Sequence, residues 1–213
     1  IASGCDFETN DAESGSGGAV FVDGGTFRAT SCTFTDNFTQ FGTGGAIYGQ
    51  LGATIEVINS NFNGNDSREG GGPGAIAVDN STLTVTDSVF TANVADGGSG
   101  GAIGATDSTV TVTGSTFTDN LANGGSGGGI SHFNGALTVR DSSFTGNNAE
   151  GGYGGGVSVE GGSGLVEDSV FTDNLANGGS GGGIGAEGGT TIVRRSLFTG
   201  NTTPGGGGGA FVV

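Results

Sequence analysis

The feature that most constrains this chain is a repeat with a period of about 27 residues, clearest between residues 100 and 126 (GGAIGATDSTVTVTGSTFTDNLANGGS). One landmark of the repeat is a small residue that closes a glycine-rich run and precedes an apolar residue. It occurs eight times, and the spacing is constant except between Ala46 and Ala75, where it is two positions longer. The eight positions are Ala19, Ala46, Ala75, Ala102, Gly129, Gly156, Gly183 and Ala210. A fixed internal period of this length predicts an array of stacked structural repeats.

A second landmark is the motif F-x-x-N, which also occurs eight times. One extra residue lies before Phe62 and one after it, near Pro73. Loops absorb such insertions, whereas packed strands do not. The eight copies are Phe7/Asn10, Phe34/Asn37, Phe62/Asn65, Phe90/Asn93, Phe117/Asn120, Phe144/Asn147, Phe171/Asn174 and Phe198/Asn201.

Within each repeat the apolar residues alternate with polar ones. Val110 and Val112 are separated by Thr111, and Phe117 is flanked by Thr116 and Thr118. This alternation predicts half-buried strands, and no segment shows a helical stripe. Each repeat therefore reads as a short strand, a turn, a longer strand, a bend, a short strand and a glycine-rich turn.

These patterns predict an all-β, right-handed parallel β-helix (β-solenoid) in which one repeat forms one coil with three strands. We expect one domain over residues 1–213 with seven to eight coils, either complete or a segment of a longer chain. Equivalent strands would stack at about 4.8 Å, which turns equivalent residues into ladders. The expected core ladders are Phe34, Phe62, Phe90, Phe117, Phe144, Phe171 and Phe198, and Asn37, Asn65, Asn93, Asn120, Asn147, Asn174 and Asn201.

Composition excludes several classes of partner. The 21 acidic residues outnumber the five arginines, and the formal net charge is −16. Such a surface repels nucleic acids and anionic membranes. No stretch approaches the roughly 20 apolar residues of a membrane-spanning helix, so we expect the chain not to span a membrane.

Two cysteines occupy equivalent positions in neighbouring repeats. Cys5 and Cys32 lie one repeat apart, and each precedes a ladder phenylalanine by two positions, where other repeats carry serine. The strand spacing lies within the Cα range of a disulfide, so we predict a Cys5–Cys32 bridge, with two free buried thiols as the alternative. A bridge would suit an extracellular protein.

Neither a cofactor nor a structural metal is expected. Two cysteines and one histidine are too few for a four-ligand metal site, and calcium among surface aspartates is the remaining option. His132 is predicted to be a packed structural residue. Arg140, Glu167 and Arg194, with Asp168 and Arg195 beside them, predict a cross-strand ladder of ion pairs.

The outward positions beside the ladder phenylalanines form the candidate binding face. They predict a flat, regular, uncharged strip that resembles the ice-binding faces of unrelated β-solenoid antifreeze proteins. The alternative is that threonine is simply a good strand residue. The threonines assigned to this face are Thr33, Thr35, Thr91, Thr116, Thr118, Thr145, Thr172 and Thr199.

The combination of GGA followed by an apolar residue with F-x-x-N resembles the repeat of the polymorphic membrane proteins. These are autotransporter adhesins of chlamydiae, and related bacterial surface proteins carry similar repeats. Residues 17–19, 44–46, 100–102 and 208–210 hold intact GGA, and all eight F-x-x-N copies are intact. The resemblance implies a secreted passenger-type β-helix with adhesive or self-associating roles.

The leading functional expectation is a non-enzymatic extracellular or cell-surface module that serves as an adhesin or in self-assembly. Its partner would be an extracellular surface or another copy, paired head to tail or edge to edge through open strands. The alternatives are an ice-binding protein and a polysaccharide-active enzyme. The enzyme alternative rests on fold-level analogy, because Asp36, Asp119 and Asp173 share one position but never lie in adjacent coils.

Overall fold

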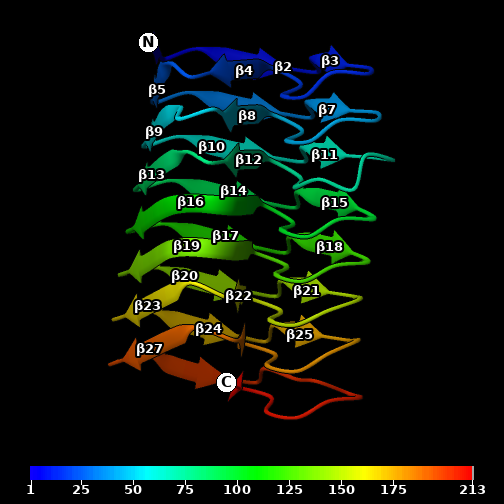
Figure 1. The fold of residues 1–213 in the computed structure, drawn as a ribbon, viewed down its shortest axis with the longest axis vertical. Coiled ribbons are helices and arrows are strands. Elements are labelled where there is room, and N and C mark those ends of the chain that lie inside the picture. Colours follow the sequence, from blue (N-terminus) through cyan, green and yellow to red (C-terminus); the bar gives the residue numbers. More distant parts are fainter. Residues whose placement is uncertain (213) are drawn as a thin grey trace.

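The computed structural model describes residues 1–212, with side chains up to residue 210, and it is a right-handed parallel β-helix. Each coil of about 27 residues advances the chain by one step along the axis, from the N-terminus at one end to the C-terminus at the other (Figure 1). The described strands form three parallel sheets. The predicted all-β architecture and the coil length are confirmed.

Sheet A is the largest of the three, with fourteen strands. Most coils contribute two of its strands, separated by a bend, and in two coils the pair merges into one strand of 11 residues. Its strands are β1 (Ala2–Ser3), β4 (Val20–Asp23), β5 (Thr26–Thr30), β8 (Ile47–Gln50), β9 (Thr54–Ile58), β12 (Ile76–Asp79), β13 (Thr82–Thr86), β16 (Ile103–Thr113), β19 (Ile130–Arg140), β22 (Val157–Glu160), β23 (Ser163–Glu167), β26 (Ile184–Glu187), β27 (Thr190–Arg194) and β29 (Phe211–Val212).

Sheet B contains the strands that carry the ladder phenylalanines, and sheet C contains shorter strands that follow the ladder asparagines. Sheet B is made of β2 (Asp6–Glu8), β6 (Thr33–Thr35), β10 (Asn61–Asn63), β14 (Val89–Thr91), β17 (Thr116–Thr118), β20 (Ser143–Thr145), β24 (Val170–Thr172) and β28 (Leu197–Thr199). Sheet C is made of β3 (Asp11–Ala12), β7 (Phe38–Thr39), β11 (Asp66–Ser67), β15 (Val94–Asp96), β18 (Leu121–Asn123), β21 (Asn148–Ala149) and β25 (Leu175–Ala176).

The division of a coil into strands differs from the predicted one. The two strands expected before the phenylalanine strand both belong to sheet A, and the third sheet is built by segments predicted to be turns. The inner residues of these segments are small, such as Thr39, Ser67 and Ala95. They are too small and too polar to produce the apolar alternation that marks a strand in a sequence.

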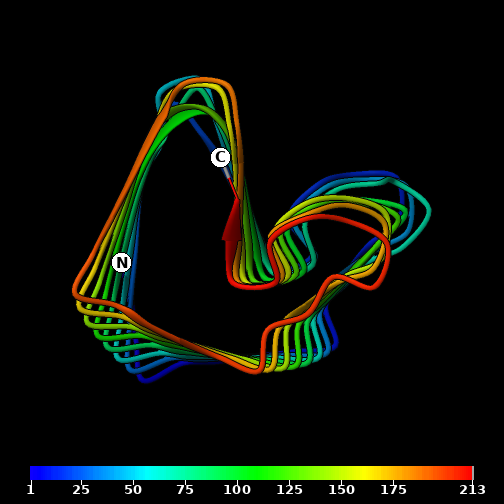
Figure 2. The same cartoon turned by 90° about the horizontal axis from the view of Figure 1, so that it is seen from below.

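Seen along the axis, each coil has a roughly triangular main loop and a second, narrower loop beside it (Figure 2). The main loop holds the apolar core, whose largest buried side chains include the phenylalanines from Phe34 to Phe171. Neighbouring phenylalanine rings lie nearly parallel, with centroids 4.5 Å apart for Phe34 and Phe62 and 4.9 Å apart for Phe171 and Phe198. Since each ring contacts both neighbours, no coil completes its core alone.

The asparagine ladder lies at the bend between sheets B and C, and it is buried. Asn93 Nδ2 donates to Asn120 Oδ1 at 2.9 Å and to the carbonyl oxygen of Phe62 at 3.1 Å. Asn120 Oδ1 also accepts the backbone N–H of Asn93 at 3.1 Å. The side-chain amides thus bond along the axis and satisfy backbone groups that the bend leaves without a strand partner, as predicted.

The GGA motif forms the neck between the two loops of a coil. Gly100 has a φ of 78°, in the left-handed region that favours glycine. A Cβ on Gly101 would lie 2.6 Å from the backbone nitrogen of Leu121 and closer still to the carbonyl oxygen of Gly128. Ala102 then enters the core. The motif therefore combines a left-handed turn, a backbone-to-backbone approach and a small core residue.

We expect Gly101→Ala to lower the free energy of unfolding by about 2–3 kcal/mol, because the added methyl must displace backbone atoms on two sides. The matched control is Gly15→Ala in another glycine-rich turn, where an added Cβ would meet only Ala12 Cβ at 3.7 Å. That variant should stay within about 0.5 kcal/mol of wild type. Urea denaturation measures both values, and equal effects would contradict this role of the neck.

Candidate functional site

The outer side of sheet B brings the predicted binding-face threonines into two straight columns. Strand pairing aligns Thr91 with Thr118 and Thr118 with Thr145, without a shift in register. On each sheet B strand the two outward residues flank a phenylalanine of the stacked ladder. The outward columns therefore repeat at the same coil-to-coil spacing as the phenylalanines. The full columns, from β6 to β28, are Thr35, Asn63, Thr91, Thr118, Thr145, Thr172, Thr199 and Thr33, Asn61, Val89, Thr116, Ser143, Val170, Leu197.

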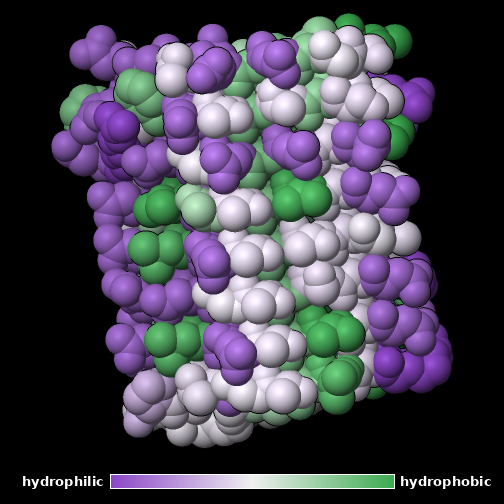
Figure 3. Space-filling model, turned by 180° about the vertical axis from the view of Figure 1, so that it is seen from behind, coloured by the Kyte–Doolittle hydropathy of each residue, from purple (hydrophilic) through white to green (hydrophobic). Residues whose placement is uncertain are grey.

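None of these fourteen positions, two on each of seven strands, carries a charge. Figure 3 shows this side of the molecule, where pale side chains of intermediate hydropathy run in columns with green, apolar side chains among and beside them, and purple, hydrophilic side chains are most abundant along the edges and at the top. Val89, Val170 and Leu197 are exposed by 39%, 39% and 59%. The face is therefore neutral and partly apolar rather than a pure threonine array, and the first coil adds the acidic residues of β2 at one end.

A column in which aspartate is followed by glycine in the next coil borders this face, at the bend after the sheet B strands. Asp119 has a φ of 52° there, and the matching residue of the next coil is Gly146. A Cβ on Gly146 would collide with Asp119 Oδ1, so the carboxylate lies over the glycine. Asp36 and Asp173 have the same relation to Gly64 and Gly200. The shared aspartate position is thus part of a bend, where aspartate tolerates a left-handed backbone.

The histidine predicted to be a structural residue is fully buried in the main core. His132 Nε2 lies 3.1 Å from the carbonyl oxygen of Ser108, and Nδ1 has no hydrogen-bond partner among the described residues. Burial lowers the pKa of His132, against a smaller opposing effect of the bond to Ser108. Its neighbours in the stack are Ala105 and Val159, which supply no nucleophile or carboxylate.

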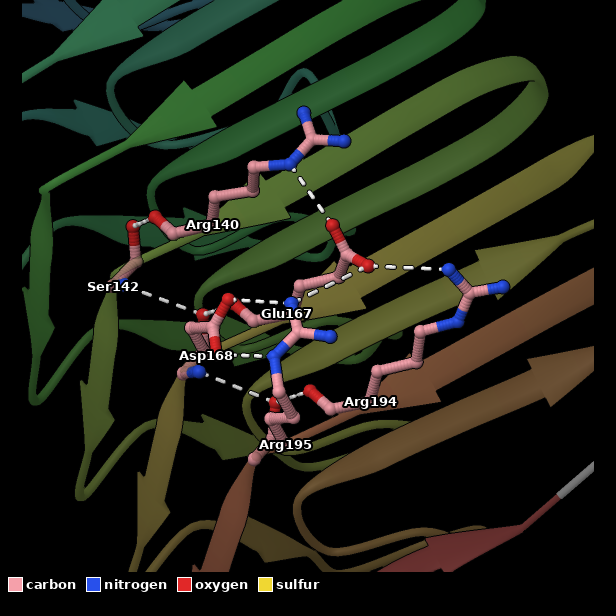
Figure 4. Close-up of polar contacts among 8 residues, drawn as sticks. Arg140, Ser142, Glu167, Asp168, Arg194 and Arg195 are labelled. Atoms are coloured by element: carbon pink, nitrogen blue, oxygen red, sulfur yellow. Dashed lines mark hydrogen bonds and ion pairs between the residues drawn. The ribbon is translucent and has the colours of Figure 1, made fainter.

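The predicted ladder of ion pairs forms at the C-terminal end of sheet A (Figure 4). Glu167 accepts from Arg140 Nε at 3.1 Å on one side and from Arg194 Nη1 at 3.4 Å on the other. Arg195 donates twice to Asp168, at 2.7 Å each, and this hydrogen bonding lowers the pKa of Asp168. Because Arg140 and Arg194 are about half exposed, each of their pairs with Glu167 adds only a few tenths of a kcal/mol.

The predicted disulfide is wrong in this structure, because both cysteines are free. Cys32 Sγ points to the carbonyl oxygen of Thr30 at 3.4 Å, and Cys5 Sγ points to that of Ser3 at 3.5 Å. Ser88 uses the same geometry, with Oγ donating to the Thr86 carbonyl at 2.8 Å. The side chain at this position therefore contacts the carbonyl oxygen two residues before it, and no bond joins the two sulfurs.

Among the described residues, no three histidine, cysteine or carboxylate side chains gather in a group able to hold a metal ion. The calcium option stays a prediction. No helix within residues 1–212 has the length and apolar character needed to cross a bilayer.

Comparison with known proteins identifies the architecture and nothing finer. The family described as a right-handed β-helix region matches residues 1–169. No curated protein and no solved structure matches the chain. The finer resemblance to polymorphic membrane proteins therefore stays a prediction.

The unpaired Nδ1 of His132 predicts a pH-dependent stability. The folded-state pKa is lowered, so the unfolded chain binds more protons as the pH falls through about 6.5. The free energy of unfolding should decrease between pH 7 and pH 5, with a slope no steeper than about 1.4 kcal/mol per pH unit. His132→Val, which copies Val159 of the next coil, should abolish this slope. Urea denaturation across this range measures it, and equal slopes in both proteins would contradict the assignment.

Proposed function

The chain belongs to the right-handed β-helix family, and from its surface we propose that it is a non-enzymatic extracellular module that adheres through the outer face of sheet B. The observation that carries the proposal is the neutrality of this face. Fourteen outward positions in register lack any charge, in a chain whose net charge is −16. A neutral, flat strip is the part of an acidic surface that loses least hydration free energy when a second surface covers it.

The apolar side chains on this face support the same proposal. Val89, Val170 and Leu197 expose a large part of their surface in one column. Covering such side chains contributes about 25 cal/mol per Å² of apolar area. Exposed apolar groups gathered on one face, rather than scattered singly, are typical of contact surfaces.

Three kinds of polar group that the repeat places at regular or singular positions are used by the fold, which favours a non-enzymatic role. The ladder asparagines bond one another, His132 is enclosed in the core, and Asp119 lies in a bend against Gly146. The extracellular location rests on the resemblance to secreted passenger domains and stays part of the proposal, as does pairing of copies through their ends.

The test introduces charge into the face. Thr118→Glu with Thr145→Glu places two carboxylates in adjacent coils of sheet B. Adsorption to hydroxyl-terminated and methyl-terminated monolayers, followed by surface plasmon resonance, should fall at least tenfold. The matched control is Thr111→Glu with Thr138→Glu, at outward positions of the same two coils in sheet A, where Glu56 occurs naturally in the same column. Equal losses in both variants, or no adsorption by wild type, would refute the proposal.

Ice binding is the second candidate, favoured by one specific observation. Six of the seven residues in the column from Thr35 to Thr199 are threonine, in unbroken register. The threonines lie on the same strands as the stacked phenylalanines and so repeat at the same spacing from coil to coil. The ring centroids of Phe117 and Phe144 are 4.6 Å apart. Regular rows of threonine hydroxyl and methyl groups could order water in a matching lattice.

If this candidate is right, wild type shows thermal hysteresis and slows ice recrystallisation. Thr145→Tyr, which breaks the flat column in its middle, should remove most of that activity. Thr138→Tyr on the outer side of sheet A should leave it intact. Absence of thermal hysteresis in wild type ends the ice-binding candidate and leaves the adhesion proposal standing, since the two use different readouts.

A further inference from the structure

A cleft of about 520 Å³ runs along the axis on a different part of the surface from the binding face. One wall is the outer side of the sheet A strand that begins each coil, from β8 to β22. The other wall is the edge of the glycine-rich turns. Figure 2 shows the main loop and the narrower loop that carry these two walls. The cleft shares no lining residue with the adhesion face, so a ligand here is independent of that proposal.

Small residues open this cleft. Where β16 passes the turns, Gly104 leaves room for Pro73, and a Cβ on Gly104 would lie 3.0 Å from Pro73 Cβ and closer still to its Cγ. Ala77 and Ser131 occupy the matching positions of the adjacent coils. Tyr48 lines the cleft in the coil before. Pro73 therefore covers Gly104, and small side chains form the floor of the cleft in the two adjacent coils.

The column of residues along the strand wall carries the chemistry. Strand register places Asp79, Thr106, Phe133 and Glu160 in one line, one per coil, and all four line the cleft. Phe133 is half exposed. Three coil steps of about 4.8 Å separate the two carboxylates by about 14 Å. The line thus reads as carboxylate, hydroxyl, aromatic ring, carboxylate.

Both carboxylates are held in place by neutral donors. Asn80 Nδ2 donates to Asp79 Oδ1 at 3.0 Å, and Ser158 Oγ donates to Glu160 Oε1 at 3.1 Å. Within residues 1–212 neither carboxylate is in an ion pair, although all five arginines are paired elsewhere. The pKa of Tyr48 is raised by burial and then by the charges of Asp79 and Asp23, which agrees with a negative potential at this end.

We propose that the cleft binds an extended, lysine- or arginine-bearing peptide segment of another protein, with cationic side chains at positions i and i+4. An extended chain rises about 3.3 Å per residue, so these side chains lie on the same side and about 13 Å apart. That separation matches the distance between Asp79 and Glu160. The side chain at i+2 faces the gap between Thr106 and Phe133, where a small apolar group fits. A second copy of this chain is a poor occupant, because its arginines are already paired.

The test uses an acetylated, amidated and fluorescently labelled pentapeptide, Lys-Ser-Val-Ser-Lys, against the whole chain by fluorescence anisotropy. Binding should weaken as salt is added, because the ion pairs are solvent-accessible. The peptide Lys-Lys-Val-Ser-Ser has the same composition but adjacent charges, so it should bind several-fold more weakly. Spermine serves as a separate arm, since a linear polyamine offers similar charge spacing without a peptide backbone.

The decisive variant is Asp79→Asn with Glu160→Gln, which should lower peptide affinity by about tenfold. Its matched control is Asp36→Asn with Asp119→Asn, which removes the same charge from bends beside sheet B and should leave affinity unchanged. Thermal unfolding of both variants checks that they fold. Equal losses in the two variants, equal affinity for both peptides, or tighter binding of spermine than of the peptide would each overturn the proposal.

Discussion

The hydrogen-bonded ladder of asparagine amides is the interaction on which the rest of the structure depends. Each coil must bend sharply between sheets B and C, and a bend leaves backbone groups without strand partners. Asn120 meets this need in both directions: its Oδ1 accepts two bonds from Asn93, and its Nδ2 donates to Asn147 Oδ1 and to the Phe90 carbonyl. Because each amide needs an identical amide one coil away, the ladder imposes one register on the whole stack.

The other ladders follow from that register. Once the asparagines align, Phe117 stacks on Phe90 and Phe144 with centroids 4.8 and 4.6 Å away. The glycines of the neck align as well, so backbones approach where no Cβ would fit. Outward columns are then aligned in the same way as inward ones, which gives the molecule two separate surfaces: the neutral face of sheet B and the wall of the cleft that carries Asp79 and Glu160. Surface chemistry can vary between coils while the interior remains constant.

Much of this architecture could be predicted from the sequence because the repeat copies its constraints. The alternation around Val110 and Val112 indicated a strand, and the regular spacing of phenylalanine and asparagine predicted their ladders. Sheet C was missed because buried residues such as Ser67 and Ala95 resemble turn residues. The Cys5–Cys32 spacing allowed a disulfide, but spacing does not determine the rotamer, and each thiol turns to its own strand. The cleft was missed as well, since it depends on how Pro73 packs over Gly104. The available signal was the spacing of 27 residues that separates Asp79, Thr106, Phe133 and Glu160.

The central claim is that the amide ladder, more than any single apolar contact, maintains the coil register. The most direct measurement is the free energy of unfolding of Asn120→Ala beside that of Phe117→Leu, by urea denaturation. The alanine variant removes the four buried hydrogen bonds of the Asn120 side chain. At about 1 kcal/mol for each bond, it should lose about 4 kcal/mol. The leucine variant changes the size of one core side chain and should lose less than about 2 kcal/mol. An Asn120→Ala loss equal to or smaller than that of Phe117→Leu would contradict the account.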